Sequence, residues 1–344
     1  MNIYILIIII IIIIYLIFIN FYFLILFFLY NFYIFFFLFK MANTIADDIY
    51  NILHSEDKNK EEKLKNIVIS TDNDMRVSVH QYYDAIYDPK LDDDLKKYTE
   101  SHFRDIIRDL FLHPFDYDAK QIDKAFKFFS KDDKNIYEIL TARPPWYIEE
   151  IKKAYKNKYG RDFQKDIEKN FSGDIKKNLV ILLNTPRKEN ENPDHTQCAN
   201  WAKTLEKTSP VNWATDEKIF REIFATRSPE ELVLIGRYYK QDTGKNFLDV
   251  VEKELPTKVR QLFREILYNT INPSELFAEK VKNALEGLGT NTHLLNRVII
   301  SRSDIDMKEI RDMYLYKYKN DLITDVSNDT TGAHRDLLIY LADK

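Results

Sequence analysis

The sequence predicts an all-α protein built from four repeats of about five helices each. Three observations support this fold class: one short pattern recurs four times, apolar residues between its copies are spaced by three and four, and no long segment alternates with a period of two. Spacing by three and four places apolar side chains on one helix face, whereas alternation would indicate a strand.

The repeats are found from four similar segments: "IVISTDND", "EILTARPP", "EIFATRSPEEL" and "VIISRSDI". Aligned on Thr71, Arg143, Arg227 and Arg302, they lie 72, 84 and 75 residues apart. The alignment also matches positions outside the segments. Tyrosine stands twelve residues after each of these anchor residues, and Leu or Phe stands twenty after, at Tyr83, Tyr155, Tyr239, Tyr314, Leu91, Phe163, Phe247 and Leu322.

The predicted repeats occupy residues 44–112, 116–184, 198–272 and 273–342. The longer spacing between the second and third anchors is explained by residues 185–197, a polar connector with two prolines, and we interpret it as a plain exposed linker.

Residues 1–40 differ from the rest of the chain. They contain one charged side chain, Lys40, in an apolar run longer than the ~20 residues that cross a bilayer, so one interpretation is a membrane anchor. After Met1, however, the segment uses only Ile, Leu, Phe, Tyr, Asn and Lys, whose codons can be written with A and T alone. This composition favours an AT-rich leader, with the true start at Met41.

Composition limits the classes of function. With 50 Lys and Arg against 54 Asp and Glu, the net charge is −4 and no long basic block occurs, so nucleic acid is not the expected partner. The single cysteine, Cys198, cannot form an internal disulfide, and we interpret it as a small buried residue. The sequence has no P-loop, His-Glu-x-x-His, Gly-x-Ser-x-Gly or dinucleotide fingerprint, so we do not expect an enzyme.

The segment "LEGLGTNT", residues 285–292, interrupts the helical pattern of the fourth repeat. Gly287 and Gly289 can take φ values that other residues resist, so the turn can direct several carbonyls toward one point. Carbonyls together with a carboxylate suit Ca²⁺, and Asp329 supplies a carboxylate forty residues after Gly289. Alternatively, Gly287 ends one helix, and Thr290 and Asp329 cap the next ones.

The fourth repeat closely resembles that of annexins, and the four-repeat layout over residues 44–342 with a connector after the second repeat is similar too. The resemblance implies four five-helix repeats in a right-handed superhelix, forming a curved disc. It also implies a calcium site between the first two helices of a repeat. Carried over by position, the ligands are the carbonyls of Leu285, Gly287 and Gly289 and the carboxylate of Asp329.

The other repeats depart from this motif. In the first, Lys58 and Tyr98 stand at the places of Gly289 and Asp329, and in the second Asn170 replaces the acid, so neither is expected to bind calcium. In the third, "VNWATDE" keeps part of the pattern. The resemblance implies a weakened site there, formed by Asn212, Ala214 and Glu254.

The resemblance also suggests residues that contact the membrane. Trp213 is either a core aromatic or an exposed loop residue, and its polar neighbours favour exposure. Thr290 and Glu286 are further expected contacts; Glu286 stands where annexins usually carry a basic residue. A central polar cluster of Asp118, Arg143 and Arg297 matches buried positions of the family, and we interpret it as an internal salt-bridge cluster rather than an ion path.

Two functions remain open. The first is a cytoplasmic, monomeric protein that binds anionic phospholipid membranes peripherally through Ca²⁺; it would be an integral membrane protein only if residues 1–40 are translated. The second is a cytoskeletal or scaffold role with little calcium dependence, similar to the divergent alpha-giardins, because repeats one and two have lost the motif.

Overall fold

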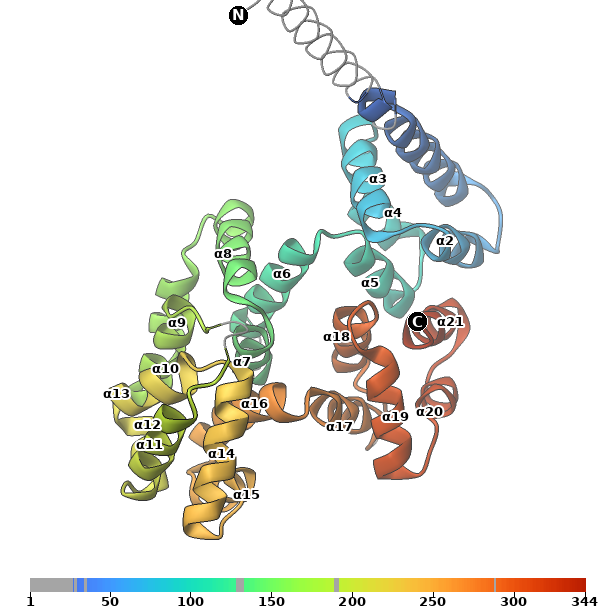
Figure 1. Ribbon diagram of the computed structural model, residues 1–344. Helices are drawn as coiled ribbons and strands as arrows, with labels where there is room; N and C mark the ends of the chain where they lie inside the picture. The colour runs from blue at the N-terminus through green and yellow to red at the C-terminus, as the bar shows by residue number, and fades with distance from the viewer. Residues whose placement is uncertain (1–26, 28–29, 34–35, 128–132, 189–191, 288) are drawn as a thin grey trace, which may run out of the picture. The chain divides into compact units, whose positions relative to one another are not determined.

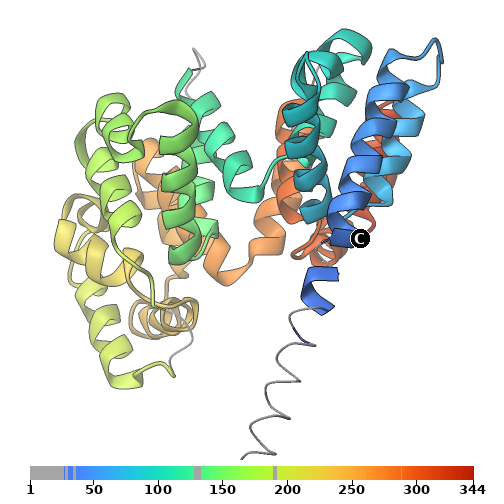
Figure 2. The same cartoon turned by 90° about the horizontal axis from the view of Figure 1, so that it is seen from above.

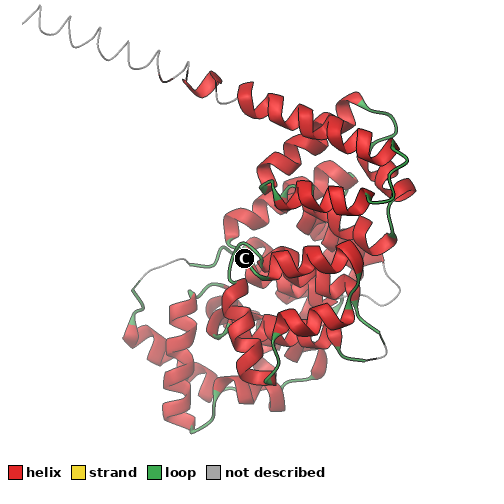
Figure 3. Cartoon of the chain, turned by 90° about the vertical axis from the view of Figure 1, so that its right-hand side faces the viewer, coloured by secondary structure: helices red, strands yellow, loops and turns green. Residues whose placement is uncertain are grey.

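The computed structural model describes residues 27, 30–33, 36–127, 133–188, 192–287 and 289–344. Every regular element in these residues is a helix and no strand occurs among them, which confirms the all-α prediction (Figure 3). The chain divides into two compact units, Met1–Leu112 and His113–Lys344, and each is described by itself.

The first unit consists of a helix over residues 36–54 followed by α2 (Lys60–Ile69), α3 (Asn73–Ile86), α4 (Leu91–Tyr98) and α5 (Ser101–Leu110). In the helix over 36–54, Ala42, Ala46, Ile49 and Leu53 are at most 2% exposed, so the spacing of three and four residues buries one face. Met41 lies inside this helix rather than at its start.

Most of the segment interpreted as a leader or an anchor lies outside the described residues. In the part of the chain that the structure describes, no helix is both long and apolar enough to span a bilayer.

The second unit begins with α6 (Pro114–Lys127), α7 (Asp133–Ala142), α8 (Pro145–Tyr159), α9 (Phe163–Asn170) and α10 (Gly173–Asn184). It continues with α11 (His195–Glu206), α12 (Pro210–Thr215), α13 (Glu217–Ile219), the π-helix η1 (Phe220–Ala225), α14 (Pro229–Thr243), α15 (Phe247–Glu254) and α16 (Thr257–Ile271). It ends with α17 (Pro273–Leu285), α18 (Thr292–Arg302), α19 (Met307–Tyr318), α20 (Leu322–Asp329) and α21 (Gly332–Ala342). Within this unit, α11 packs against α14, and α17 packs against α18 and α19 (Figures 1 and 2).

Local sequence signals set many of these helix ends. The side chains of Asp72, Asp162 and Asp321 accept backbone hydrogen bonds at the starts of α3, α9 and α20. Ser228 and Glu231 form a reciprocal capping box at the start of α14. These caps fix the loops that join the helices.

The helices show the internal repetition directly. Four eight-residue helices, α4, α9, α15 and α20, begin at the matched Leu or Phe and end at the position of Asp329 or its counterpart. In three repeats, the tyrosine that stands twelve residues after the anchor donates a hydrogen bond to an aspartate on this short helix. The pairs are Tyr83 and Asp94 (2.5 Å), Tyr155 and Asp166 (2.6 Å), and Tyr314 and Asp325 (2.7 Å).

The third repeat lacks this link, because the residue eleven positions after Tyr239 is Val250. The two units therefore contain four related helix groups, three of which share the tyrosine–aspartate link. The residue boundaries given above for the four repeats stay a prediction.

Candidate functional site

The loop between α17 and α18 has the backbone that the glycine pattern predicts. Gly287 and Gly289 have φ values of 120° and 94°, in the left-handed region that favours glycine. A Cβ atom on either residue would meet nothing within 4 Å, so backbone conformation rather than crowding requires glycine here. The two glycines therefore shape this part of the chain through their backbone conformation.

A hydrogen bond to the backbone carbonyl of Asp329 holds this residue beside the loop. The Thr290 hydroxyl donates a hydrogen bond to the Asp329 carbonyl at 3.0 Å, and the Asn291 amide donates to the Ala284 carbonyl at 2.7 Å. The first bond joins the two segments of the predicted site, and the second closes the loop on the end of α17.

The capping alternative is wrong for both Thr290 and Asp329. Asp329 is the last residue of α20, and Thr331 is the N-cap of α21. Asn291, rather than Thr290, caps α18, by accepting from the Leu294 amide. The exposed Asp329 side chain therefore does not act as a helix N-cap.

The donor groups at this loop are those that a hard cation prefers. Among the described residues, no three His, Cys, Asp or Glu side chains gather around one point, so a cation here would rely mainly on backbone oxygens. Leu285 is the last residue of α17, where carbonyls lack partners within the helix. Glu286 is 61% exposed, and one of its carboxylate oxygens lies 3.6 Å from the Lys282 ammonium.

In the third repeat, the residues suggested as ligands already have other partners. Asn212 and Ala214 lie in helix α12, and their carbonyls accept hydrogen bonds from the Asp216 amide at 2.9 Å and the Asn178 side chain at 3.0 Å. Glu254 forms an ion pair with Lys245 at 2.8 Å. A cation at this place would have to displace these contacts.

In the first repeat, Lys60 at the start of α2 lies next to the corresponding loop. The Lys60 ammonium donates to the Leu53 carbonyl at 2.7 Å and lies 4.7 Å from the ring centre of Tyr98. An ammonium group thus joins the end of one helix to the end of α4. In the second repeat, Asn170 donates to the Asp166 carbonyl at 2.8 Å, and the facing loop lies outside the described residues.

The comparison with known families agrees with this arrangement. The annexin family model matches residues 117–182, 202–266 and 276–341. These segments make up more than half of the chain. The chain belongs to the annexin family.

Individual annexins match over most of the chain. Mouse annexin A3 is 32% identical over 281 residues, which cover 82% of this chain and 87% of that protein. Mouse annexin A6 is 31% identical over 301 residues, or 87% of this chain, but the match spans only 44% of the longer annexin A6.

Solved structures show the same fold. Annexin III has a TM-score of 0.82 at 30% identity, with 88% of this chain and 94% of that chain covered. The calcium-bound annexin (Sm)1 has a TM-score of 0.76 at 26% identity, covering 88% and 90%. Alpha-14 giardin in a calcium-bound form has a TM-score of 0.72 at 17% identity, covering 87% and 99%; this likeness concerns the fold alone.

The prediction that Trp213 is exposed is wrong for this annexin. Trp213 is 0% exposed and packs against the rings of Phe224, Tyr239 and Phe247. Its indole donates a hydrogen bond to the Leu205 carbonyl at 3.3 Å. The segment that looked like a polar turn is the helix α12, which places the tryptophan on its inner face, so we withdraw Trp213 as a membrane contact.

The central polar cluster is real, but its pairing differs from the prediction. Arg143 forms an ion pair with the buried Asp118 at 2.8 Å, as expected. Arg297 instead pairs with Glu138 at 2.5 Å, and Glu138 also accepts from Lys280 at 2.6 Å. Lys280 forms a second ion pair with Glu265 at 2.8 Å.

Sequence reasoning missed Glu138, Lys280 and Glu265. One signal was available: Glu138 and Arg297 each stand five residues before an anchor arginine, so opposite charges occupy equivalent positions of the second and fourth repeats. Burial by itself would raise the pKa of Glu138, but Arg297 and Lys280 lower it to about 2. Burial raises the pKa of Glu265 above its ordinary value, although Lys280 acts in the opposite direction.

Proposed function

We propose that this annexin binds anionic phospholipid membranes peripherally and in a calcium-dependent manner, through the loop between α17 and α18. The observation that carries the proposal is the hydrogen bond between Thr290 and the Asp329 backbone, because it joins a glycine loop to an exposed carboxylate. Calcium-bound annexin (Sm)1 shares the fold, which supports calcium as the ligand.

In this proposal, the carbonyls of Leu285, Gly287 and Gly289 and the carboxylate of Asp329 hold the cation. The positive φ values of the two glycines allow the chain to turn within five residues, and the Thr290 hydroxyl holds Asp329 beside the turn. When bound, Ca²⁺ would supply the positive charge that attracts a lipid phosphate. The third repeat, with Asn212, Ala214 and Glu254 otherwise engaged, is proposed as a weakened site at most.

Sedimentation with vesicles tests this function. Protein beginning at Met41 is mixed with vesicles containing phosphatidylserine, in calcium or in EGTA, and we expect it to pellet with the vesicles only in calcium. If it pellets equally in both, the calcium proposal fails. Calcium-independent pelleting with actin or microtubules would support the scaffold role instead, for which the loss of the glycine motif in the first and second repeats is the argument.

Glu286→Lys is expected to strengthen calcium-dependent vesicle binding. Glu286 is exposed beside the proposed lipid contact, where its negative charge repels phosphate, and lysine would attract it. We expect the calcium concentration for half-maximal binding to fall about two- to threefold, with a larger change at low salt. Glu309→Lys, an equal charge change at an exposed position in the first turn of α19, is the control, and equal gains in both variants would show a general charge effect.

A further inference from the structure

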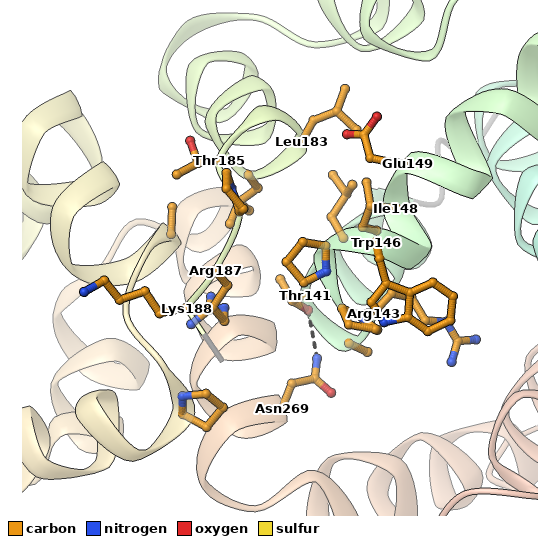
Figure 4. A pocket seen from close by; sticks show the side chains of 18 of the residues that line it. Thr141, Arg143, Trp146, Ile148, Glu149, Leu183, Thr185, Arg187, Lys188 and Asn269 are labelled. Carbon is orange, nitrogen blue, oxygen red and sulfur yellow. Dashed lines mark hydrogen bonds between the residues drawn. The ribbon is translucent and has the colours of Figure 1, made fainter. Parts of the chain in front are cut away.

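A cavity of about 610 Å³ lies inside the second unit, away from the calcium loop (Figure 4). This volume is within the ~300–1,000 Å³ typical of small-molecule sites. One wall is formed by the end of α7 and the start of α8, with Thr141, Arg143 and Trp146. The opposite wall is formed by Thr185, Pro186 and Arg187 of the connector, and Asn269 of α16 lies below them in the view of Figure 4.

The described first part of the connector is exposed at Pro186 and Lys188, but hydrogen bonds hold it in place. The Lys188 amide donates to the Thr226 carbonyl at 2.9 Å. The Arg187 guanidinium donates to the carbonyls of Arg227 at 2.8 Å and Phe224 at 2.7 Å. These bonds hold residues 187 and 188 against the end of η1, so this wall of the cavity is fixed.

Arg187 differs from the other two arginines that line the cavity. Arg143 is paired with Asp118, and Arg302 is paired with Asp306. Among the residues that the structure describes, no acidic side chain pairs with Arg187, whose hydrogen-bond partners are two neutral carbonyls. A guanidinium has five N–H donors, so three are left for a ligand.

The surroundings of Arg187 disfavour its positive charge. Burial lowers the pKa of Arg187 to about 10, so the side chain is still protonated at neutral pH. Arg187 is half-buried, and no acidic side chain among the described residues balances its charge. A partly desolvated cation without an anion is unfavourable, and an oxyanion in the cavity would offset that cost with charge-assisted hydrogen bonds.

The opposite wall offers an apolar surface. Trp146 is 60% exposed although its indole is one of the largest apolar side chains of the protein, and Figure 4 places it across the cavity from Arg187. Exposed indoles of this kind suit the apolar part of an amphipathic ligand. Between the two walls, Asn269 donates to the Thr141 hydroxyl at 2.8 Å, which joins α16 to α7 across the floor.

We propose that this cavity binds a small amphipathic oxyanion, a carboxylate or phosphate on an apolar body, with Arg187 holding the oxyanion and Trp146 contacting the apolar body. This site acts independently of calcium. A free amphiphile and a lipid headgroup in a bilayer share this chemistry, and the proposal commits to the free molecule because the half-buried Arg187 lines a cavity rather than an open surface.

Calorimetric titration in EGTA, with monomeric decanoate, decyl phosphate and decylammonium, tests the proposal. We expect the two anions to bind at one site and decylammonium not to bind. Arg187→Gln should weaken decanoate binding at least about tenfold, because a charged hydrogen-bond donor is lost, while Arg237→Gln at an exposed position outside the cavity leaves it unchanged. Trp146→Ala should reduce the advantage of decanoate over acetate.

Equal binding of decanoate and decylammonium would overturn the proposal, as would unchanged decanoate affinity in folded Arg187→Gln. Binding to phosphatidylserine vesicles in EGTA without binding of the monomers would also overturn it. If Arg187→Gln does not fold, the comparison of anions with decylammonium on the wild-type protein decides. None of these measurements depends on the calcium loop, so the outcome is separate from that of the membrane-binding proposal.

Discussion

Asp329→Asn is expected to abolish most calcium-dependent vesicle binding while leaving the fold intact. Asparagine keeps the size of the side chain but replaces a charged, potentially bidentate ligand with one neutral oxygen. The contact that holds the site together uses the Asp329 backbone carbonyl, so the substitution does not remove it. Vesicle sedimentation should require at least about tenfold more calcium for half-maximal binding, because the ligand set loses one unit of negative charge next to a divalent cation.

The matched control is Asp304→Asn, which removes an exposed carboxylate from the loop before α19. It should leave calcium-dependent binding unchanged. Thermal unfolding of both variants should occur within a few degrees of the wild-type protein, since Asp329 is exposed. If Asp329→Asn binds calcium and vesicles as well as the wild-type protein, the loop between α17 and α18 is not a calcium site.

Glu138→Gln should be among the most destabilising single substitutions in the second unit. Glu138 is 4% exposed and forms ion pairs with both Arg297 and Lys280, so its loss leaves the buried Arg297 without this anionic partner. Breaking a buried ion pair from one side typically costs ~3–5 kcal/mol. Urea unfolding followed by circular dichroism would measure the difference.

Glu265→Gln is the matched comparison and should cost less than Glu138→Gln. Glu265 shares Lys280 with Glu138, but burial raises its pKa, so its charged form is less well stabilised by its surroundings. A larger loss for Glu265→Gln than for Glu138→Gln would contradict the assignment of Glu138 as the principal anion of the network.

The same network gives a pH dependence with a definite sign. Arg297 and Lys280 hold the pKa of Glu138 at about 2, below its ordinary value of 4.5. Its stabilising contribution is therefore fully present above about pH 4.5 and is lost as the pH falls toward 2. The difference in unfolding free energy between wild type and Glu138→Gln should shrink over that range, and a difference independent of pH would contradict the mechanism.

Much of the architecture could be predicted because one sequence pattern recurs four times along the chain. The anchors, the matched tyrosines and the glycine loop depend on local patterns, and each corresponds to helices or φ values in the structure. Trp213 could not be placed in this way. In helix α12, polar neighbours on one side say little about the residue that faces inward.

Ion pairs between residues far apart in the sequence also could not be predicted from short sequence patterns. Which acid meets Arg297 depends on how α7 and α18 pack, and 159 residues separate Glu138 from Arg297. The hydrogen bonds of the connector could not be predicted for the same reason: its composition is that of an exposed loop, and only the carbonyls at the end of η1 show why Arg187 is held in place.

The tyrosine–aspartate link has a consequence for how the repeats open. Separating the short helix from its neighbour in the first, second or fourth repeat breaks a hydrogen bond to a carboxylate, which costs ~1.5–3 kcal/mol. The third repeat, with Val250 at that place, opens without this cost and also contains the π-helix η1. The backbone amides of α15 should therefore exchange with solvent hydrogen sooner than those of α4, α9 and α20. Sequence differences between the repeats thus produce differences in local stability.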